Sequence, residues 1–180
     1  MTHGHADAIG ALPYILSEFK APVFGSPLTI ELAKLFVKKN NNAKKFNNFH
    51  VIDAETEIEF ADERISFFKT THSVPESLGI VVGTDEGNIV YTGDFKFDQA
   101  ARKYYRTDLS RLTEIGREGV LALLSDSANA TSNVLTASES EVAAEMDSII
   151  ADAEGRVIIA AVASNLIRIQ QVFDSATLRL

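Results

Sequence analysis

Apolar residues recur at helical spacing along the first part of the chain. Over residues 7–19 they return every three or four positions, which predicts a helix with Asp7 as its N-cap. Ala21-Pro22 ends this helix, Val23-Phe24 fits a short strand, and residues 28–39 predict a second helix. In the second helix the four large apolar residues Leu28, Leu32, Leu35 and Phe36 lie on one face.

Short apolar runs rich in β-branched residues follow, each bounded by turn residues. They predict strands at residues 49–52, 57–60, 65–71, 79–84 and 88–92, with a hairpin turn at residues 85–87. This part should be largely an antiparallel meander. A helix at residues 108–117 then leads into the continuous apolar run 120–124, which is typical of a strand buried on both faces.

The last part of the chain changes to an α/β pattern. A helix at residues 139–153, a strand at 157–162 and a helix from about residue 165 predict a tail resembling a βαβ unit. Residues 129–137, rich in Ala, Thr, Ser and Asn, separate this tail from the preceding strand. We therefore predict two domains, residues 1–130 and residues 131–180, with the boundary in this linker.

The composition says little about the fold, but it limits which metal ligands and partners the chain can have. The 180 residues are 46% hydrophobic and include no cysteine, so the chain is globular and any metal ligand must be His or a carboxylate. A formal net charge of −8 argues against coating nucleic acid by bulk charge and leaves room for a local basic groove. The start lacks a signal-peptide pattern and no apolar run is long enough to span a membrane, so we expect a cytoplasmic protein without membrane association.

Candidate metal ligands stand at the start of the chain and at two strand ends. His3, His5 and Asp7 precede the first helix on one loop, and zinc needs three or four such donors. His72 and Asp94 each follow a predicted strand, where active-site residues often lie. Taken singly, each residue has a structural explanation as part of a tag-like start, a satisfied loop histidine or a turn residue. Taken together they favour a metal site, and we predict that His3, His5, His72 and Asp94 converge at one end of the sheet.

Four motifs link the chain to a known family. They are Thr-His-Gly-His-x-Asp at residues 2–7, Phe-Phe-Lys-Thr-Thr-His-Ser at 67–73, Gly-Asp-Phe-Lys-Phe-Asp at 93–98 and Ser-Asp-Ser-x-Asn-Ala at 125–130. In this order they resemble ribonuclease J, an RNA-degrading family of the metallo-β-lactamase fold. The resemblance implies an α/β chain: an incomplete αββα sandwich of the metallo-β-lactamase type, followed by the start of a β-CASP domain. It also implies that the chain is a piece of a longer protein, lacking strands before His3 and most of the β-CASP domain.

The resemblance further implies a site for two zinc ions. His3, His5 and His72 would hold the first ion, Asp94 would bridge to the second, and Asp7 would belong to the second. Asp7 and Asp94 are thereby the expected catalytic carboxylates. Such a site activates water for attack on a phosphodiester, here in RNA, degraded from its 5′ end or cut internally during maturation and decay.

Phosphate contacts are also implied by the resemblance. Asp126 falls on the carboxylate that opens the β-CASP domain, and Ser127, Ser164 and Asn165 match positions near RNA phosphate. Unpaired N–H groups at a helix start suit phosphate for a general physical reason. A serine N-cap explains Ser164 equally well.

Two positions depart from the family pattern, and they open an alternative function. Ala8 stands where the family has a histidine ligand of the second ion, and Ile167 stands where a later segment usually carries histidine. Both departures resemble those of the weakly active second paralogue of Gram-positive bacteria. The alternative to a ribonuclease is therefore a non-catalytic subunit, in a homodimer or in a heteromer with an active paralogue. A thioester or lactam hydrolase is a third candidate, against which the Ser125-Asp126-Ser127 motif counts.

Overall fold

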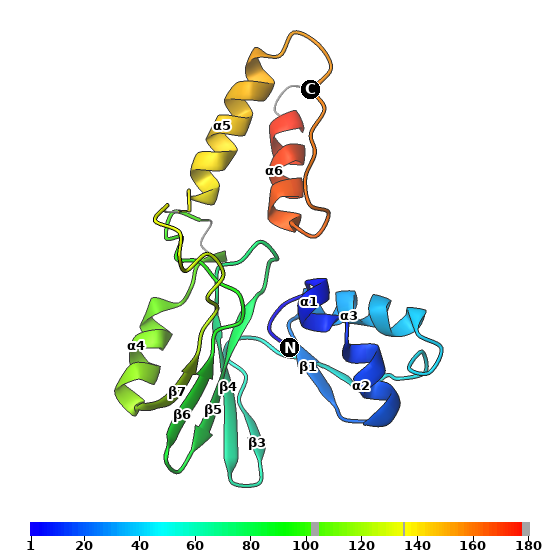
Figure 1. Ribbon diagram of the computed structural model, residues 1–180, viewed down its shortest axis with the longest axis vertical. Helices are drawn as coiled ribbons and strands as arrows, with labels where there is room; N and C mark the ends of the chain where they lie inside the picture. Colours follow the sequence, from blue (N-terminus) through cyan, green and yellow to red (C-terminus); the bar gives the residue numbers. More distant parts are fainter. Residues whose placement is uncertain (102–104, 135, 178–180) are drawn as a thin grey trace.

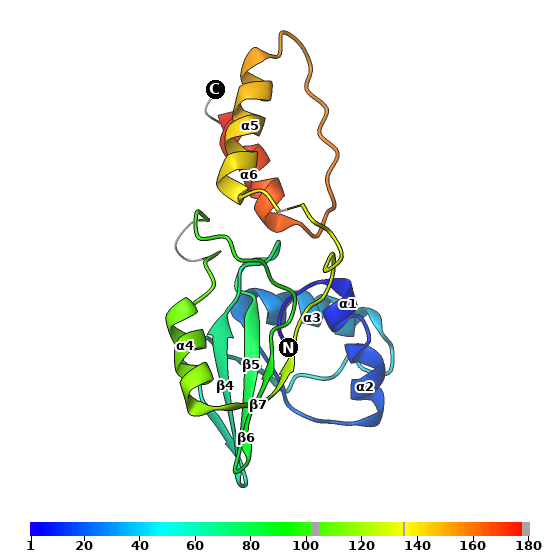
Figure 2. The ribbon, with the colours of Figure 1, turned by 60° about the vertical axis from the view of Figure 1, so that its left-hand side comes forward.

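The computed structural model describes residues 1–101, 105–134 and 136–177, arranged as an N-terminal lobe, a central sheet and a helical hairpin (Figure 1). In Figures 1 and 2 the hairpin stands above the other two parts, and helix α4 lies on the side of the sheet away from the lobe. None of the helices in the described ranges is long and apolar enough to cross a membrane.

The central sheet has five strands in the order β3-β4-β5-β6-β7. Strands β3 (Ile58–Phe60), β4 (Glu63–Lys69), β5 (Leu78–Thr84) and β6 (Gly87–Tyr91) pair antiparallel, as the sequence predicts. Helix α4 (Leu109–Glu118) then crosses over to β7 (Val120–Leu124), which pairs parallel to β6. A parallel neighbour needs such a crossover, and a helix is its usual form.

Two hydrophobic clusters cover the two faces of this sheet. Ile115 of α4 packs on one face against Phe68, Val81 and Val90. On the other face Phe67 and Leu78 pack with Ile52, which lies just after β2. The alternation of inward and outward side chains along β4 thus places Phe67 and Phe68 in different clusters.

The N-terminal lobe joins helices α1 (Ala6–Ile9), α2 (Leu12–Glu18) and α3 (Pro27–Lys39) to the parallel strands β1 (Val23–Gly25) and β2 (Phe49–Val51). The single helix expected over residues 7–19 is wrong, because the chain breaks into α1 and α2. Pro13 has no N–H to donate to Ile9 and its ring would clash with that carbonyl, so the helix cannot run through. The N-cap of α1 is His5, and Asp7 lies inside the first turn.

The face of α3 with its large apolar residues is not the face that the helix buries most fully. The helix buries Thr29, Ile30, Ala33 and Val37, whereas Leu35 is 54% exposed. Both sets obey helical spacing, because α3 carries apolar residues on two stripes. Which stripe is buried depends on where β1 and α2 lie. Ile30 and Val37 belong to the same hydrophobic cluster as Leu16 of α2 and Val23 of β1.

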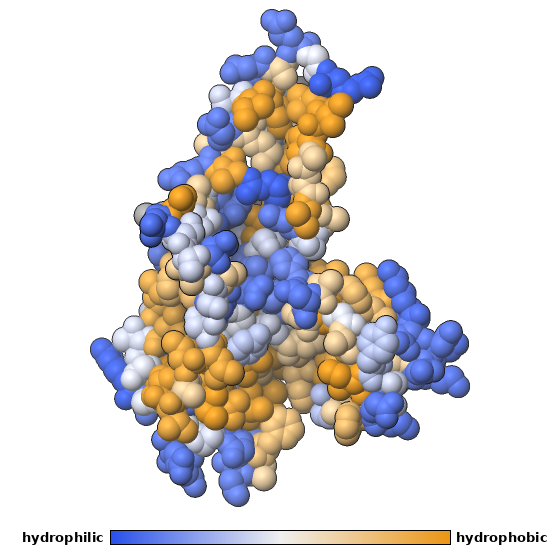
Figure 3. Space-filling model, in the orientation of Figure 1, coloured by the Kyte–Doolittle hydropathy of each residue, from blue (hydrophilic) through white to orange (hydrophobic). Residues whose placement is uncertain are grey.

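Strand β7 is not buried on both faces, contrary to the sequence-based expectation. All five of its residues are exposed, and Leu123 is 63% exposed. The strand forms one edge of the sheet, and α4 reaches over β4, β5 and β6 instead. Figure 3 shows an apolar surface over this part of the sheet.

The tail is a pair of helices, α5 (Glu139–Asp152) and α6 (Leu166–Thr177). The strand expected over residues 157–162 is wrong: all six residues are described and none lies in a strand. Ile158 is 86% exposed, because this segment has no neighbouring strand to pair with. The tail is therefore not a βαβ unit. The boundary at residues 129–137 stays a prediction, and Leu135 and residues 178–180 lie outside the described residues.

Candidate metal centre

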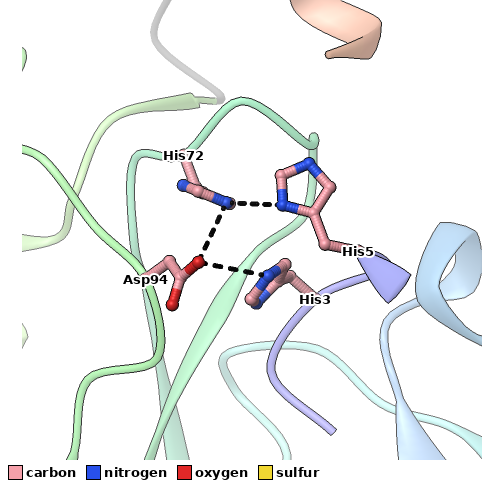
Figure 4. Close-up of side chains that lie close together, drawn as sticks. All are labelled: His3, His5, His72 and Asp94. Atoms are coloured by element: carbon pink, nitrogen blue, oxygen red, sulfur yellow. Dashed lines mark hydrogen bonds and ion pairs between the residues drawn. The ribbon is translucent and has the colours of Figure 1, made fainter. Parts of the chain in front are cut away.

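Four candidate ligands come together from three separate segments of the chain. His3 and His5 lie on the stretch before α1, His72 follows β4, and Asp94 follows β6. One ligand atom from each lies within 4.8 Å of all the others (Figure 4). The convergence expected for His3, His5, His72 and Asp94 is present in the structure.

The sequence around the histidines explains their placement. The main-chain oxygen of Thr2 accepts a hydrogen bond from the Leu78 amide of β5, which fixes the chain just before His3. Between the two histidines, a Cβ at Gly4 would lie 2.3 Å from Leu32 Cδ1, so a side chain there would require Leu32 of α3 to move. The N-terminal stretch is thereby held between the sheet and α3.

Glycine is also required beside the carboxylate. Gly93 has a φ of 59°, and a Cβ there would lie 2.9 Å from the Cβ of Thr2. A side chain at this position would strain the backbone and push against the residue before His3. The Gly-Asp pair of the motif therefore has a steric reason.

The distances between the ligand atoms suit a tetrahedral ion. Nε2 of His72 lies 3.0 Å from Nδ1 of His5, and Oδ2 of Asp94 lies 3.6 Å from Nε2 of both His3 and His72. Four donors around zinc, each roughly 2.0–2.2 Å from it, stand about 3.3–3.6 Å apart. In addition, Nε2 of His3 is buried and has no hydrogen-bond partner. An orphaned imidazole nitrogen aimed at three other donors fits a metal ligand.

In His3 and His5, the ring nitrogen that faces away from the other ligands has a polar partner that orients the ring. His3 Nδ1 lies 3.1 Å from Thr2 Oγ1, which leaves Nε2 to face Asp94. His5 Nε2 donates to the main-chain oxygen of Ser164 at 3.3 Å, because a carbonyl can only accept. Its Nδ1 then carries the lone pair toward His72, which is the form that a metal ligand needs.

Burial keeps two of the histidines neutral. It lowers the pKa of His72 to about 4, with His3 and His5 adding to this effect and Asp94 and Asp126 opposing it. The pKa of His3 is also lowered, chiefly by burial and against the pull of Asp94. Neutral imidazole is the metal-binding form, so both rings are ready to bind near pH 7.

Asp7 and Ala8 are not members of the four-residue group. Both are exposed on α1, and Asp7 is not among the donors that converge. Within the described residues this is the one cluster of three or more His, Cys, Asp and Glu that could hold an ion. Of the residues that the resemblance implies for a second ion, Asp94 therefore lies within the group, whereas Asp7 lies outside it and is exposed.

The residues expected near phosphate lie on two sides of the centre. Ser127 is exposed after β7. Ser164 is exposed and offers its main-chain oxygen to His5, while Asn165 Oδ1 accepts from the Arg168 amide and so caps α6. The helix cap is Asn165 and not the serine. Ile167 is buried, and its amide donates to the main-chain oxygen of Ser73 at 3.4 Å.

Sequence reasoning missed the residues that hold the ligand loops. Thr71 and Thr107, both buried, exchange hydrogen bonds from the amide of each to the hydroxyl of the other. Asp126, which was assigned only by resemblance, accepts from the Phe95 amide, and its own amide donates to Thr92 Oγ1. Their signal is weak, because Thr and Asp beside a turn are common in any chain.

The fold and this centre agree with the family that the sequence matches. The profile of the metallo-beta-lactamase superfamily matches residues 1–138, and the chain belongs to that superfamily. Among curated proteins it is 78% identical over 177 residues to "Ribonuclease J 2" of Streptococcus pyogenes serotype M3, and 45% identical over 177 residues to "Ribonuclease J 2" of Staphylococcus epidermidis. These relatives confirm the expected resemblance to ribonuclease J.

These matches cover nearly all of this chain but only part of each relative. Each match takes in 98% of the chain and 32% of the relative, so the chain spans about a third of the length of these proteins. Among solved structures, a protein of unknown function from Enterococcus faecalis V583 aligns with a TM-score of 0.64 at 12% identity, covering 86% of this chain and 39% of that one. This likeness concerns the fold alone.

Proposed function

We propose that this chain forms the metal-binding part of a ribonuclease J-type metallohydrolase that degrades RNA in the cytoplasm. The observation that carries the proposal is the convergence of His3, His5, His72 and Asp94 in a chain 78% identical to a protein named "Ribonuclease J 2". Three neutral nitrogens and one carboxylate are a zinc donor set. The superfamily supports a metal ion here, and zinc is our proposal for its identity.

The protein residues around the centre have distinct roles in the proposed reaction. Bound zinc would supply Lewis acidity and lower the pKa of water near the scissile phosphodiester. His3, His5 and His72 would contribute the nitrogen donors, and Asp94 would contribute a carboxylate oxygen. Ser127, Ser164 and Asn165 are proposed to contact the RNA phosphates; of these, Ser127 and Ser164 are exposed.

The experiment compares two histidines in the full-length protein. His72→Ala removes a ligand, and we expect it to lower both bound zinc and cleavage of a 5′-monophosphorylated RNA. His50→Ala is the matched control, because His50 is exposed on β2 and bonds to Asn48, far from the ligand set. Equal zinc content in the two variants would rule out the proposed site. Labelling the RNA at each end would separate exonuclease from endonuclease products.

The second candidate function is that of a non-catalytic subunit. It is favoured by Ala8, since the exposed start of α1 offers Asp7 alone as a further donor. Such a subunit would bind one metal ion yet cleave RNA only after mixing with an active paralogue, in a heteromer. Size-exclusion chromatography of the mixture, followed by the same RNA assay, distinguishes this outcome from independent activity.

A further inference from the structure

The hairpin formed by α5 and α6 contacts the candidate metal centre through the loop before α6. The main-chain oxygen of Ser164, just before α6, accepts the hydrogen bond from His5 Nε2. Ser73 Oγ lies 3.3 Å from the same nitrogen, and the Ile167 amide donates to the main-chain oxygen of Ser73. One imidazole thus has its outer edge against two segments, one from the sheet and one from the hairpin.

This contact selects one form of His5. With Nε2 protonated and bonded outward, a neutral ring must leave Nδ1 unprotonated, and Nδ1 is the atom that faces His72. Metal-bound histidines usually donate their other ring N–H to a carbonyl or carboxylate in this way. The acceptor here lies 159 positions later in the chain.

A polar cluster at the base of α5 holds the hairpin in place. Asp98, 5% exposed, accepts from the Ser138 hydroxyl and from the Glu139 amide, each at 2.8 Å. Glu139 in turn pairs with Lys96 at 2.9 Å and with Arg168 of α6 at 3.2 Å. Lys96 and Asp98 belong to the loop that also carries Asp94, so this cluster, Lys96–Asp98–Ser138–Glu139–Arg168, ties the hairpin to a ligand loop.

We propose that the α5–α6 hairpin is a positioning element of the metal centre, with the Ser164 carbonyl setting the ring orientation and tautomer of His5. Metal binding and hairpin docking are then coupled, and the coupling is reciprocal: docking raises metal affinity, and metal stabilises docking. The inference rests on the proposed metal site and adds a role for a region that contributes no ligand of its own.

The test weakens docking without touching a ligand, since replacing the Ser164 side chain would leave its carbonyl in place. In the full-length protein, Glu139→Ala removes the pairing with Lys96 and Arg168, while Glu139→Gln keeps an acceptor oxygen. Glu145→Ala is the matched control, an exposed acid on the same helix. Zn²⁺ affinity is measured by competition with a chelator. We expect Glu139→Ala to bind Zn²⁺ about 10-fold more weakly, Glu139→Gln to recover most of that loss, and Glu145→Ala to match the wild type.

Hydrogen exchange on the wild-type protein gives an independent measurement. Added Zn²⁺ should slow exchange of the amides of residues 164–177 by about 5-fold or more. This arm holds even if Glu139→Ala proves unstable. Wild-type-like Zn²⁺ affinity in a folded Glu139→Ala, or unchanged exchange in α6 upon Zn²⁺ binding, would overturn the inference alone. If the wild-type protein does not bind Zn²⁺, the proposed function is contradicted, and the inference that rests on it is contradicted as well.

Discussion

Ala8 occupies an exposed position on α1, directly after Asp7 and close in sequence to two ligands. A methyl group cannot donate to a metal, so a second ion near Asp7 and Asp94 would have at least one donor fewer than the family pattern provides. Exposure also means that a larger side chain can be placed there without disturbing a core.

Ala8→His in the full-length protein should therefore raise zinc content toward two ions per chain and increase RNA cleavage. The cost to α1 is small, on the order of 0.7 kcal/mol or less in helix propensity. Ala6→His, at an exposed position on the same helix, is the control and should change neither quantity. Zinc content by elemental analysis checks the result. If Ala8→His leaves it unchanged, the buried Ile167 becomes the next position to restore.

The lowered pKa of His72 predicts how the metal-free protein responds to acid. The pKa is about 4 in the folded chain and about 6.5 when unfolded. Between these values the unfolded state binds more protons, so the free energy of unfolding should fall as the pH drops from 6.5 to 4 and be level above. His72 alone contributes on the order of 2–3 kcal/mol to that fall.

Urea denaturation with a chelator present, from pH 4.5 to 7.5, measures this dependence. His72→Gln should flatten the curve, because glutamine does not titrate. His50→Gln should leave its slope as in the wild type. A wild-type curve that is flat over this range would show that His72 is not held neutral by the fold.

At the scale of elements, the loops after β4 and β6 are aligned by one buried pair of threonines. Thr71 precedes His72, and its main-chain oxygen accepts from the Lys96 amide two positions after Asp94. Thr107 closes the arrangement through its reciprocal bonds to Thr71. Two loops that carry ligands are thus fixed to the segment before α4.

Thr107→Val should loosen this arrangement, because it keeps the shape of the side chain and removes the hydroxyl that the Thr71 amide needs. An unsatisfied buried amide costs about 1–3 kcal/mol, and we expect a loss of stability in that range together with weaker zinc binding. Thr113→Val on the exposed side of α4 is the control. Thermal unfolding and chelator competition give the two values, and equal behaviour of both variants would contradict the role assigned to Thr107.

The elements that sequence reasoning found are those fixed by local pattern. The apolar, β-branched runs at residues 65–71 and 79–84 predict β4 and β5, and the helix predicted at residues 108–117 is α4. One error had a local cause, the break that Pro13 makes between α1 and α2, whereas the errors at β7 and at residues 157–162 depended on neighbours that the local sequence does not reveal. The apolar run 120–124 is a strand in either environment, and only its neighbours decide whether it is buried.

The same division holds in the candidate site. His3, His5, His72 and Asp94 could be predicted because histidines and a carboxylate before the first helix and after two strands are the residue types that a zinc site needs. The Ser164 carbonyl could not, because every residue has one and its placement depends on a contact across 159 positions. Asp7 was included by its motif, and its distance from the four donors depends on the direction of α1.

At the scale of the whole molecule, the apolar edge of the sheet dominates the surface behaviour. Val120, Leu121, Leu123 and Leu124 of β7 are between 44% and 63% exposed, with unpaired backbone groups beside them. Exposed apolar edge strands favour association with other chains. We expect the 180-residue chain, expressed alone, to self-associate and to bind a hydrophobic dye.

Leu123→Lys should shift this chain toward the monomer, because a charge on an edge strand opposes pairing. Ile149→Lys, at an exposed apolar position on α5, is the control and should have little effect. Analytical ultracentrifugation over a range of concentrations decides between them. A wild-type chain that stays monodisperse with a sharp thermal transition would mean that β7 does not drive association.

The contact between His5 and Ser164 also has a consequence for biosynthesis. The ribosome adds the acceptor of this hydrogen bond, Ser164, 159 residues after His5. At bacterial elongation rates of about 5–20 residues per second, roughly 10–30 s separate the two. Once Asp94 has been added, the nascent chain carries the three candidate imidazole ligands and this carboxylate without the group that orients His5, so metal insertion into the finished geometry has to follow the synthesis of Ser164.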